Sequence, residues 1–375
     1  MTRVLVLGVN PFEDLPGYQL LSLLKSSGEY EIIAADDSAP ALAILSRTGT
    51  KIETLPHPSE DPRYFTGLVA NICAERSIDI LLPGTDSHLY ALASCLSDQP
   101  QLGRLCPTLE WLASQSLLNK LDLQDWASAF AATPTRWAFD DEGAARNFTS
   151  DSRYPIMVKG VRKGAVKCDD ELEAIVARRA ILRNPANQGP GGGAYAESVV
   201  DGEEHSLFVL AGARGERLRT FSFRKLAVTQ LGTTLAARVN RDLPLDIDVD
   251  GILAELTAPT VLELEWRKDG AGRSWLFEIN VRFPSWIGSL DHYGLRLLED
   301  YMDRVLHSAP DVASASPGPA EGSIFYRLPQ SGFLQLEAAF AAPSGNGRTE
   351  PTHQGYGPKM PLLWESASPH QFRLK

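Results

Sequence analysis

The chain has 375 residues, of which 43% are hydrophobic and 22% are charged; these globular proportions exclude a disordered chain or a coiled coil as the overall description. Its 36 lysines and arginines against 47 aspartates and glutamates give a net charge of −11, which argues against a general nucleic-acid binder because an acidic surface repels phosphate backbones. A local cluster of cations remains compatible with a small anionic ligand.

Neither a membrane span nor a zinc or disulfide framework is indicated. No apolar run approaches the roughly 18 residues of a spanning helix, and the N-terminal run ends at Gly8. The four cysteines form no CxxC pair. We therefore expect a cytoplasmic protein with buried, reduced thiols and without nucleic-acid or membrane partners.

The first hundred residues alternate between strand and helix patterns, which predicts a Rossmann-like α/β unit around a parallel sheet. The expected strands are 3–7, 31–35 and 78–82, and the expected helices are 15–25 and 62–76. GxGxxG is absent, so NAD is not expected. Ligands of such sheets bind beyond the strand ends, where Gly8, Asp36 and the loop 84–86 lie. Alternatively, Asp36 and Asp86 cap the helices that follow.

The pattern changes after Cys106, and we divide the chain there. Residues 109–131 are expected to form two consecutive helices containing Lys120. Mixed strands and helices follow from 154 to 307. A Pro/Ser/Ala-rich segment then begins, with one expected strand at 322–328. The predicted units are residues 1–106, 107–307 and a linker with a C-terminal extension at 308–375.

The clearest chemical signal is the strand 274–283, read as a simple alternation of side chains. It is expected to point Leu276, Glu278, Asn280 and Arg282 to one side, with Trp275, Phe277 and Ile279 on a core face. A second strand, 261–266, carries Glu263 and Glu265 opposite three apolar residues. The turn at 268–272 predicts a hairpin that brings Glu265 close to Glu278.

The side chains of this hairpin favour a metal and phosphate site. Two carboxylates and an amide oxygen suit Mg²⁺ together with phosphate oxygens. The Arg282 guanidinium suits a phosphate or a carboxylate. The alternative is a salt-bridged hairpin at the surface.

Two further segments carry weaker signals. Lys159 ends an apolar strand and precedes a glycine-containing loop with Arg162 and Lys163, which suits a polyphosphate, although it is not a Walker A motif. An ordinary basic hairpin is the alternative. The turn 201–202 lies between Glu197 and Glu204, whose carboxylates could hold ribose hydroxyls; a simple hairpin with acids would look the same.

Taken in order, these segments resemble the ATP-grasp superfamily. The matching pieces are Lys120 in its helix pair, PIMVKG, AESVVDGEE, VLELEW and the metal strand LFEINVRF, over roughly residues 107–307. The resemblance implies a Rossmann-like N-terminal domain followed by an α+β ATP-grasp fold with two subdomains. The loop after Lys159 is short for the family, and residues 188–193 look inserted.

The resemblance also implies a role for each matching residue. The two lysines Lys120 and Lys159 would contact the α- and β-phosphates of ATP. The adenine and ribose contacts would be Glu197, the backbone of Val200, and Glu204, and Lys225 would be a further phosphate contact. Two Mg²⁺ ions, with Mn²⁺ as a substitute, would be held by Glu265, Glu278 and Asn280. Arg282, with Lys159, would act on the transferred phosphoryl group.

The expected function is that of an ATP- and Mg²⁺-dependent carboxylate–amine ligase, working through an acyl-phosphate on small-molecule or peptide substrates. A homodimer is compatible with this expectation. The alternatives are a bicarbonate-using carboxylase and a nucleotide- or peptide-binding module without catalysis. The aromatic side chains of Trp286, His292 and Tyr293 would either shape the substrate pocket or pack in the core.

Overall fold

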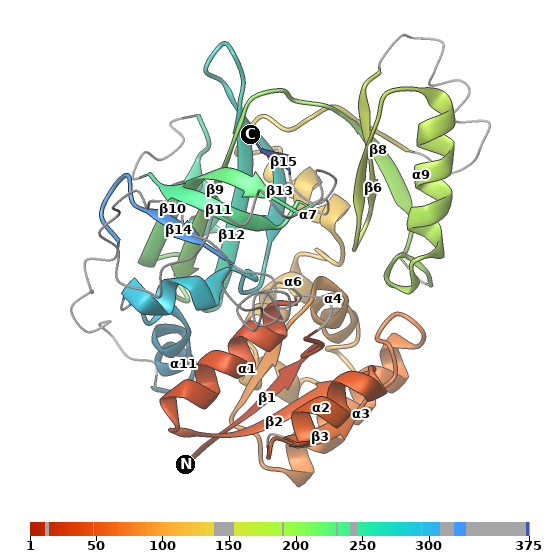
Figure 1. Ribbon diagram of the computed structural model, residues 1–375. Coiled ribbons are helices and arrows are strands. Elements are labelled where there is room, and N and C mark those ends of the chain that lie inside the picture. Colours follow the sequence, from red (N-terminus) through yellow and green to blue (C-terminus); the bar gives the residue numbers. More distant parts are fainter. Residues whose placement is uncertain are drawn as a thin grey trace, which may run out of the picture.

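The computed structural model describes residues 1–11, 15–47, 49–138, 154–189, 191–229, 232–240, 246–293, 295–307, 319–327 and 373–374. Three sheets with helices packed around them make up this part of the chain (Figure 1). Most of the predicted linker and C-terminal extension lies outside the described residues, and the boundaries of the three predicted units stay predictions.

The first part of the chain forms the predicted parallel sheet, with the strand order β3-β2-β1-β4. The predicted strands are confirmed as β1 (Thr2–Leu7), β2 (Tyr30–Asp36) and β4 (Ile80–Pro83). The predicted helices are confirmed as α1 (Pro16–Ser27) and α3 (Pro62–Glu75). Helix α3 begins where the sequence expects it, because the Asp61 carboxylate caps the helix and Pro62 occupies its first turn.

Four elements of this part were not predicted: α2 (Ala39–Arg47), β3 (Lys51–Thr54), α4 (Asp86–Ser94) and α5 (Gln101–Leu105). Strand β3 has no buried residue, so it lacks the apolar signal on which a strand prediction depends. The Asp36 carboxylate accepts a hydrogen bond from the Ser38 N–H, but Ser38 itself caps α2, because its hydroxyl accepts from the Ala41 N–H at 3.4 Å; the capping alternative is therefore wrong for Asp36. Helix α4 is capped by Thr85 instead, which leaves Asp86 available for other contacts.

The largest sheet, which we call the large sheet, is antiparallel and has the order β13-β12-β9-β10-β11-β14, with β15 beside β10. Its strands are β9 (Glu203–Ala211), β10 (Arg217–Val228), β11 (Thr234–Val239), β12 (Thr260–Lys268), β13 (Ser274–Asn280), β14 (Ile324–Tyr326) and β15 (Arg373–Leu374). The predicted hairpin is confirmed as β12 and β13, and β14 falls in the predicted strand near the C-terminal extension.

In the described part of the chain, further helices lie between the parallel sheet and the large sheet or connect their strands. They are α5 (Gln101–Leu105), α6 (Thr108–Ser114), α7 (Lys120–Ala127), α10 (Val249–Ala254), η2 (Ile287–Tyr293) and α11 (Leu297–His307). The predicted pair of helices around Lys120 is confirmed as α6 and α7. Asn119 caps α7 by accepting hydrogen bonds from two backbone N–H groups, so Lys120 is the first helical residue.

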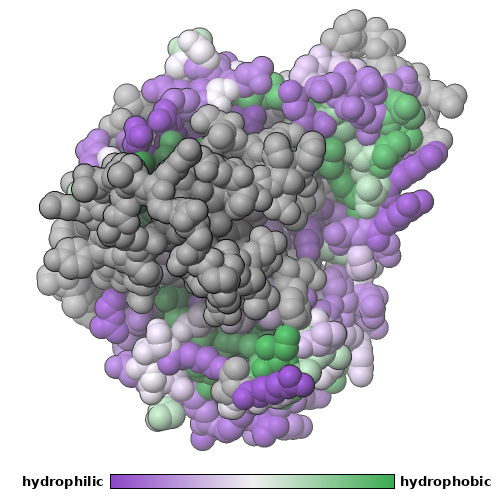
Figure 2. All heavy atoms as spheres, viewed as in Figure 1, coloured by the Kyte–Doolittle hydropathy of each residue, from purple (hydrophilic) through white to green (hydrophobic). Residues whose placement is uncertain are grey.

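A second antiparallel sheet with the order β5-β8-β6-β7 is covered by one helix; we call this unit the small subdomain. Its elements are β5 (Arg136–Ala138), β6 (Ile156–Gly160), β7 (Ala165–Cys168), α9 (Glu171–Arg183), η1 (Pro185–Asn187) and β8 (Ala194–Ser198). It has its own apolar core, in which Ile156 and Val158 meet Ala174 and Ile181. Figure 2 shows hydrophobic surface over this unit, whose exposed apolar residues include Leu172 and Val176.

The Asp201-Gly202 turn does not close a hairpin, contrary to the simpler alternative. Strand β8 belongs to the small subdomain and β9 to the large sheet, so these residues connect two different sheets. Gly202 has φ 152°, and a Cβ atom there would lie 2.0 Å from the Lys268 carbonyl oxygen. Only glycine fits this close approach, which explains the DG pair without a hairpin.

One continuous apolar cluster joins the parallel sheet to the large sheet. Leu5 and Leu81 from the first share this cluster with Leu207 and Leu262 from the second. This packing fixes the end of β4 beside the large sheet. All four cysteines are free and buried, as predicted. Among the described residues, no helix is both long and apolar enough to cross a membrane.

Candidate functional site

A β-bulge in β13 changes the predicted arrangement of its side chains. Glu265 pairs with Glu278, but the next pair is Trp266 with Leu276, so Phe277 is the extra residue. Leu276 consequently joins Ile279 in the apolar core, and the prediction that it shares a face with Glu278 is wrong.

The bulge also takes Phe277 out of the predicted core face. Its ring lies beneath the Lys159 ammonium and the Arg267 guanidinium, at 5.2 and 5.5 Å from the ring centroid. Its carbonyl oxygen accepts hydrogen bonds from Lys159 Nζ at 3.1 Å and from Gln124. The site therefore gains an aromatic face and an anchored lysine that simple alternation did not predict.

The acidic residues of the hairpin lie together as expected. Glu265 and Glu278 stand directly opposite each other on adjacent strands, and Asn280 follows on the same side of β13. Glu263, which had no predicted role, is buried and faces Asn280. Its carboxylate accepts hydrogen bonds from Ser206 at 2.9 Å, Trp286 at 2.6 Å and Asn280 at 3.2 Å.

This contact sets the orientation of Asn280. Because the Asn280 amide nitrogen donates to Glu263, its carbonyl oxygen points the other way, where Arg282 Nη2 lies at 3.4 Å. Trp286 is fully enclosed by aromatic residues, so the core-packing alternative is confirmed for it. The side chains of His292 and Tyr293 lie outside the described ones.

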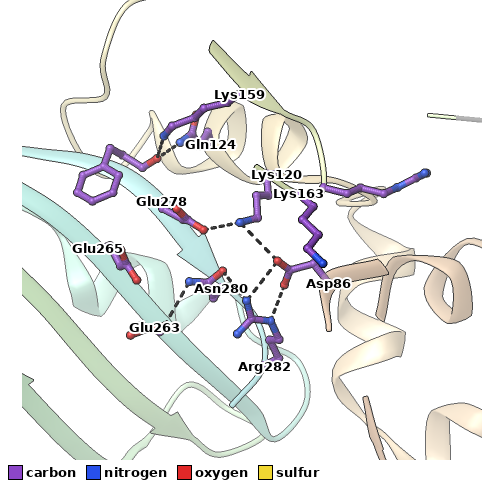
Figure 3. A network of polar contacts seen from close by, with 12 residues as sticks. Asp86, Lys120, Gln124, Lys159, Lys163, Glu263, Glu265, Glu278, Asn280 and Arg282 are labelled. Atoms are coloured by element: carbon purple, nitrogen blue, oxygen red, sulfur yellow. Dashed lines mark hydrogen bonds and ion pairs between the residues drawn. The ribbon is translucent and has the colours of Figure 1, made fainter. Parts of the chain in front are cut away.

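A network of ion pairs connects the hairpin to the parallel sheet (Figure 3). Arg282 donates to both oxygens of Asp86, at 2.9 and 3.3 Å. Lys120 Nζ lies 3.4 Å from the same carboxylate and donates to Glu278. Asp86 was left open between ligand contact and helix cap, and the structure makes it the common partner of two predicted phosphate-binding cations.

A second group of charges lies where β9, β10 and β12 run side by side. Lys225 Nζ is 2.5 Å from Glu265 and 3.0 Å from Glu204, and it is almost completely buried. Arg267, which had no predicted role, donates to Glu204 at 3.0 Å and to the Val200 carbonyl at 2.8 Å. Arg267 thus joins the predicted adenine contact Val200 to the predicted ribose contact Glu204. Lys225 in turn joins Glu204 to the predicted metal ligand Glu265.

The small subdomain contributes Lys159 and Glu197 on the neighbouring strands β6 and β8. Their charged groups are 2.5 Å apart, and both residues are buried. The second carboxylate oxygen of Glu197 has no hydrogen-bond partner among the described residues. Burial, opposed by Lys159, raises the pKa of Glu197. A buried carboxylate oxygen normally accepts a hydrogen bond, so this one is suited to accept a hydrogen bond from a bound ligand.

Burial and neighbouring charges shift the pKa values of the two predicted metal-binding acids, Glu265 and Glu278, in opposite directions. Burial, reinforced by Glu263 and Glu278 and opposed by Lys225, raises the pKa of Glu265 to about 7. For Glu278, burial is outweighed by Lys120 and Lys159, which lower its pKa. The same carboxylate raises the pKa of Lys120 against the effect of its burial. These opposite shifts favour the ionised form of Glu278 and the protonated form of Glu265.

These side chains fit a hard divalent cation. Facing carboxylates with a third acid behind them concentrate negative charge, and carboxylate and amide oxygens are the ligands that Mg²⁺ prefers. In the described part of the chain, no group of three or more His, Cys, Asp or Glu residues forms a complete metal cage. Mg²⁺ is usually held by one or two carboxylates together with substrate phosphates, and the facing pair of Glu265 and Glu278 supplies that number.

Comparisons with known proteins give similarity in structure alone. No family model matches the chain, and no curated protein matches it. A carboxyaminoimidazole ribonucleotide synthase from Aspergillus clavatus, complexed with ATP, has a TM-score of 0.59 at 16% identity, over 91% of this chain and 87% of that one. An L-amino acid ligase from Bacillus licheniformis has a TM-score of 0.57 at 16% identity, over 82% and 74% of the two chains.

A third similar structure is the biotin carboxylase domain of the Hydrogenobacter thermophilus 2-oxoglutarate carboxylase, in complex with MgADP, ADP and bicarbonate. It has a TM-score of 0.56 at 14% identity, over 84% of this chain and 71% of that chain. At such identities the shared property is the fold. The chain therefore has the ATP-grasp fold that its motifs predicted.

Proposed function

We propose that the protein is an ATP- and Mg²⁺-dependent ligase that activates a carboxylate as an acyl-phosphate and joins it to an amine. The observation that carries this proposal is the placement of Glu265 directly opposite Glu278, with Asn280 beside them and Lys120 and Arg282 bonded into the same network. This arrangement combines metal ligands with phosphate-binding cations, and it contains no protein nucleophile.

The nucleotide would lie between the small subdomain and the large sheet. The Phe277 ring offers a flat apolar surface for adenine, and the Val200 carbonyl can accept a hydrogen bond from its amino group. Glu204 is placed for the ribose hydroxyls. Arg267 now contacts all three of these residues, so ATP would have to displace its guanidinium from the site.

The residues around the phosphates would orient them and balance their charge. Lys120 and Lys159 would exchange their carboxylate partners for the α- and β-phosphates, and Lys225 would reach the phosphate chain from β10. Bound Mg²⁺, held by Glu265, Glu278 and Asn280, would neutralise phosphate charge. Phosphoryl transfer depends mainly on such alignment and neutralisation, so no covalent contribution from the chain is needed.

The reaction then follows in two steps. A substrate carboxylate oxygen attacks the γ-phosphorus, the bond to the β-γ bridging oxygen breaks, and ADP leaves. An amine nitrogen next attacks the acyl carbon, phosphate leaves with the electrons of the C–O bond, and the amine gives up a proton. Arg282, whose pKa is raised by Asp86 against its burial, stays a cation and would stabilise the transferred phosphoryl group.

Release of ADP tests this proposal. The protein with ATP and Mg²⁺ is screened against amino acids, dipeptides and other small acids, each with and without an added amine. We expect ADP release that requires both an acid and an amine. Release with bicarbonate alone would favour a carboxylase, which the similarity to a biotin carboxylase domain keeps as the second candidate. Nucleotide binding without ADP release in any combination would contradict catalysis.

The raised pKa of Glu265 predicts a pH dependence of metal activation. Below its pKa the carboxyl carries a proton that Mg²⁺ must displace, so Mg²⁺ affinity should rise with pH and then level off. We expect the apparent Mg²⁺ activation constant to fall about fivefold between roughly pH 6 and 7, and little above about pH 8. The measurement is ADP release against Mg²⁺ concentration across this range. A constant that stays flat would contradict the assignment of Glu265 as a ligand.

A further inference from the structure

A cavity of about 200 Å³ lies between the N-terminal part of the chain and the small subdomain. Its wall comes from the segment that leads into α3, from α4, from the start of α7 and from the β6–β7 loop. A space of this size is far larger than one water molecule needs and holds a small organic molecule. This cavity was not predicted, because its lining residues are far apart along the chain.

The cavity lies beside the proposed site of phosphoryl transfer. Ser87 in its wall follows Asp86, and Asn119 precedes Lys120. Tyr90 also lines it, and the charges that act most strongly on the Tyr90 hydroxyl include Asp86, Arg282 and Glu278. A molecule in the cavity would therefore contact a side chain that borders the ion-pair network.

Among the described residues, the hydroxyl group of Tyr90 has no hydrogen-bond partner. The residue is 2% exposed, and its hydroxyl oxygen is buried without a hydrogen bond among the described residues. Burial raises the pKa of Tyr90 well above its ordinary value, so the group stays a neutral donor. A buried hydroxyl normally finds a partner, and here the ligand of the cavity can provide it.

The charge of the lining selects the kind of ligand. Arg162 is the charged residue of the wall, and no carboxylate lines the cavity in the described part of the chain. Its guanidinium is held by the carbonyl oxygens of Ala186 and Gln188, which leaves it fixed and half-buried. Leu118 and Ala91 add apolar surface. A cation and a phenol donor suit an anion, whereas a cationic amine would lack a counter-charge.

We propose that this cavity binds the acid substrate of the ligase, a small organic acid with an anionic group held by the Arg162 guanidinium and the Tyr90 hydroxyl. This inference rests on the proposed function for the meaning of "substrate", but the cavity and its anion preference stand on their own geometry.

Calorimetric titration of the full chain tests the inference, with and without MgADP. The probes are succinate, phosphoglycolate and bicarbonate as anions, and glycine methyl ester as a cation. The variants are Tyr90→Phe, which removes only the hydroxyl, and Arg162→Gln. Tyr64→Phe and Arg63→Gln are matched controls, since both residues are exposed and lie outside the cavity. Thermal melting checks that each variant is folded.

We expect at least one anion to bind, no binding of the cationic ester, and a loss of about tenfold or more in affinity in each cavity variant but not in the controls. The anion that binds most tightly distinguishes a carboxylate, a phosphate ester and bicarbonate. Anion affinity in Tyr90→Phe and Arg162→Gln that equals that of the unmodified protein, preferential binding of the ester, or no anion binding at about 10 mM would overturn the inference. Failure of MgADP to bind would contradict the proposed function instead, because the titrations without nucleotide judge the cavity separately.

Discussion

Replacing Glu278 with glutamine should abolish most ADP release while leaving the protein folded. The amide keeps the shape of the side chain and an oxygen that accepts from Lys120, but it removes the charge that would hold Mg²⁺ against the phosphates. We expect the rate to fall by about 1,000-fold, the scale reached when one group that stabilises transition-state charge is removed. The rate is measured at saturating ATP and Mg²⁺ with the acid and amine found by the screen.

Glu255→Gln provides the control, because Glu255 is an exposed acid outside the site. It should release ADP at the rate of the unmodified protein. Binding of ADP in the absence of Mg²⁺ should survive in Glu278→Gln, since the lysines and the proposed adenine and ribose contacts at Glu197, Val200 and Glu204 remain. A Glu278→Gln protein that retains a tenth or more of the activity, to order of magnitude, would exclude this carboxylate as a metal ligand.

The second large effect should follow from removing Asp86. Its carboxylate is 7% exposed and neutralises Arg282, which is 16% exposed. Loss of one partner leaves the other charge buried and uncompensated, which typically costs about 3 kcal/mol. We expect Asp86→Ala to lower the free energy of unfolding by about that amount and to lower activity as well, because Arg282 loses its fixed orientation.

A double variant distinguishes a lost ion pair from lost packing. In Asp86→Ala/Arg282→Met the buried guanidinium is gone, so stability should recover in part while activity does not. Asp98→Ala breaks an exposed pair with Arg63 and should change stability little. Urea unfolding of the four proteins gives the comparison. If Asp86→Ala and Asp98→Ala unfold at the same urea concentration, the buried pair has no structural role.

Local patterns were sufficient to predict the hairpin that carries the site. Alternating apolar residues and a glycine-containing turn specify two adjacent strands, and the spacing of Glu265 and Glu278 around that turn specifies their pairing. The helical spacing of residues 109–131 likewise predicted that Lys120 lies in a pair of helices, although its place at the start of α7, after the Asn119 cap, was not predicted. The similarity of the ordered motifs to one superfamily then indicated the fold.

What the sequence did not predict depends on contacts between distant segments. Arg282 and Asp86 are 196 residues apart, and nothing local in α4 indicates that its first acidic side chain turns toward the large sheet. The bulge at Phe277 is equally hidden, because the sequence around it alternates without a break. Its cause is non-local: the carbonyl that the bulge removes from the strand ladder is bound by Gln124 and Lys159.

The extensive pairing of charges within the site has a consequence for how a nucleotide arrives. The cations and carboxylates described above nearly balance: Lys120, Lys159, Lys225, Arg267 and Arg282 against Asp86, Glu197, Glu204, Glu263, Glu265 and Glu278. A site with nearly balanced charges exerts little long-range attraction on an anion. The net charge of −11 then dominates the long-range field, so the association rate of the nucleotide should rise as salt screens this repulsion, and tight binding would come from slow dissociation once the internal ion pairs have been exchanged for phosphate contacts.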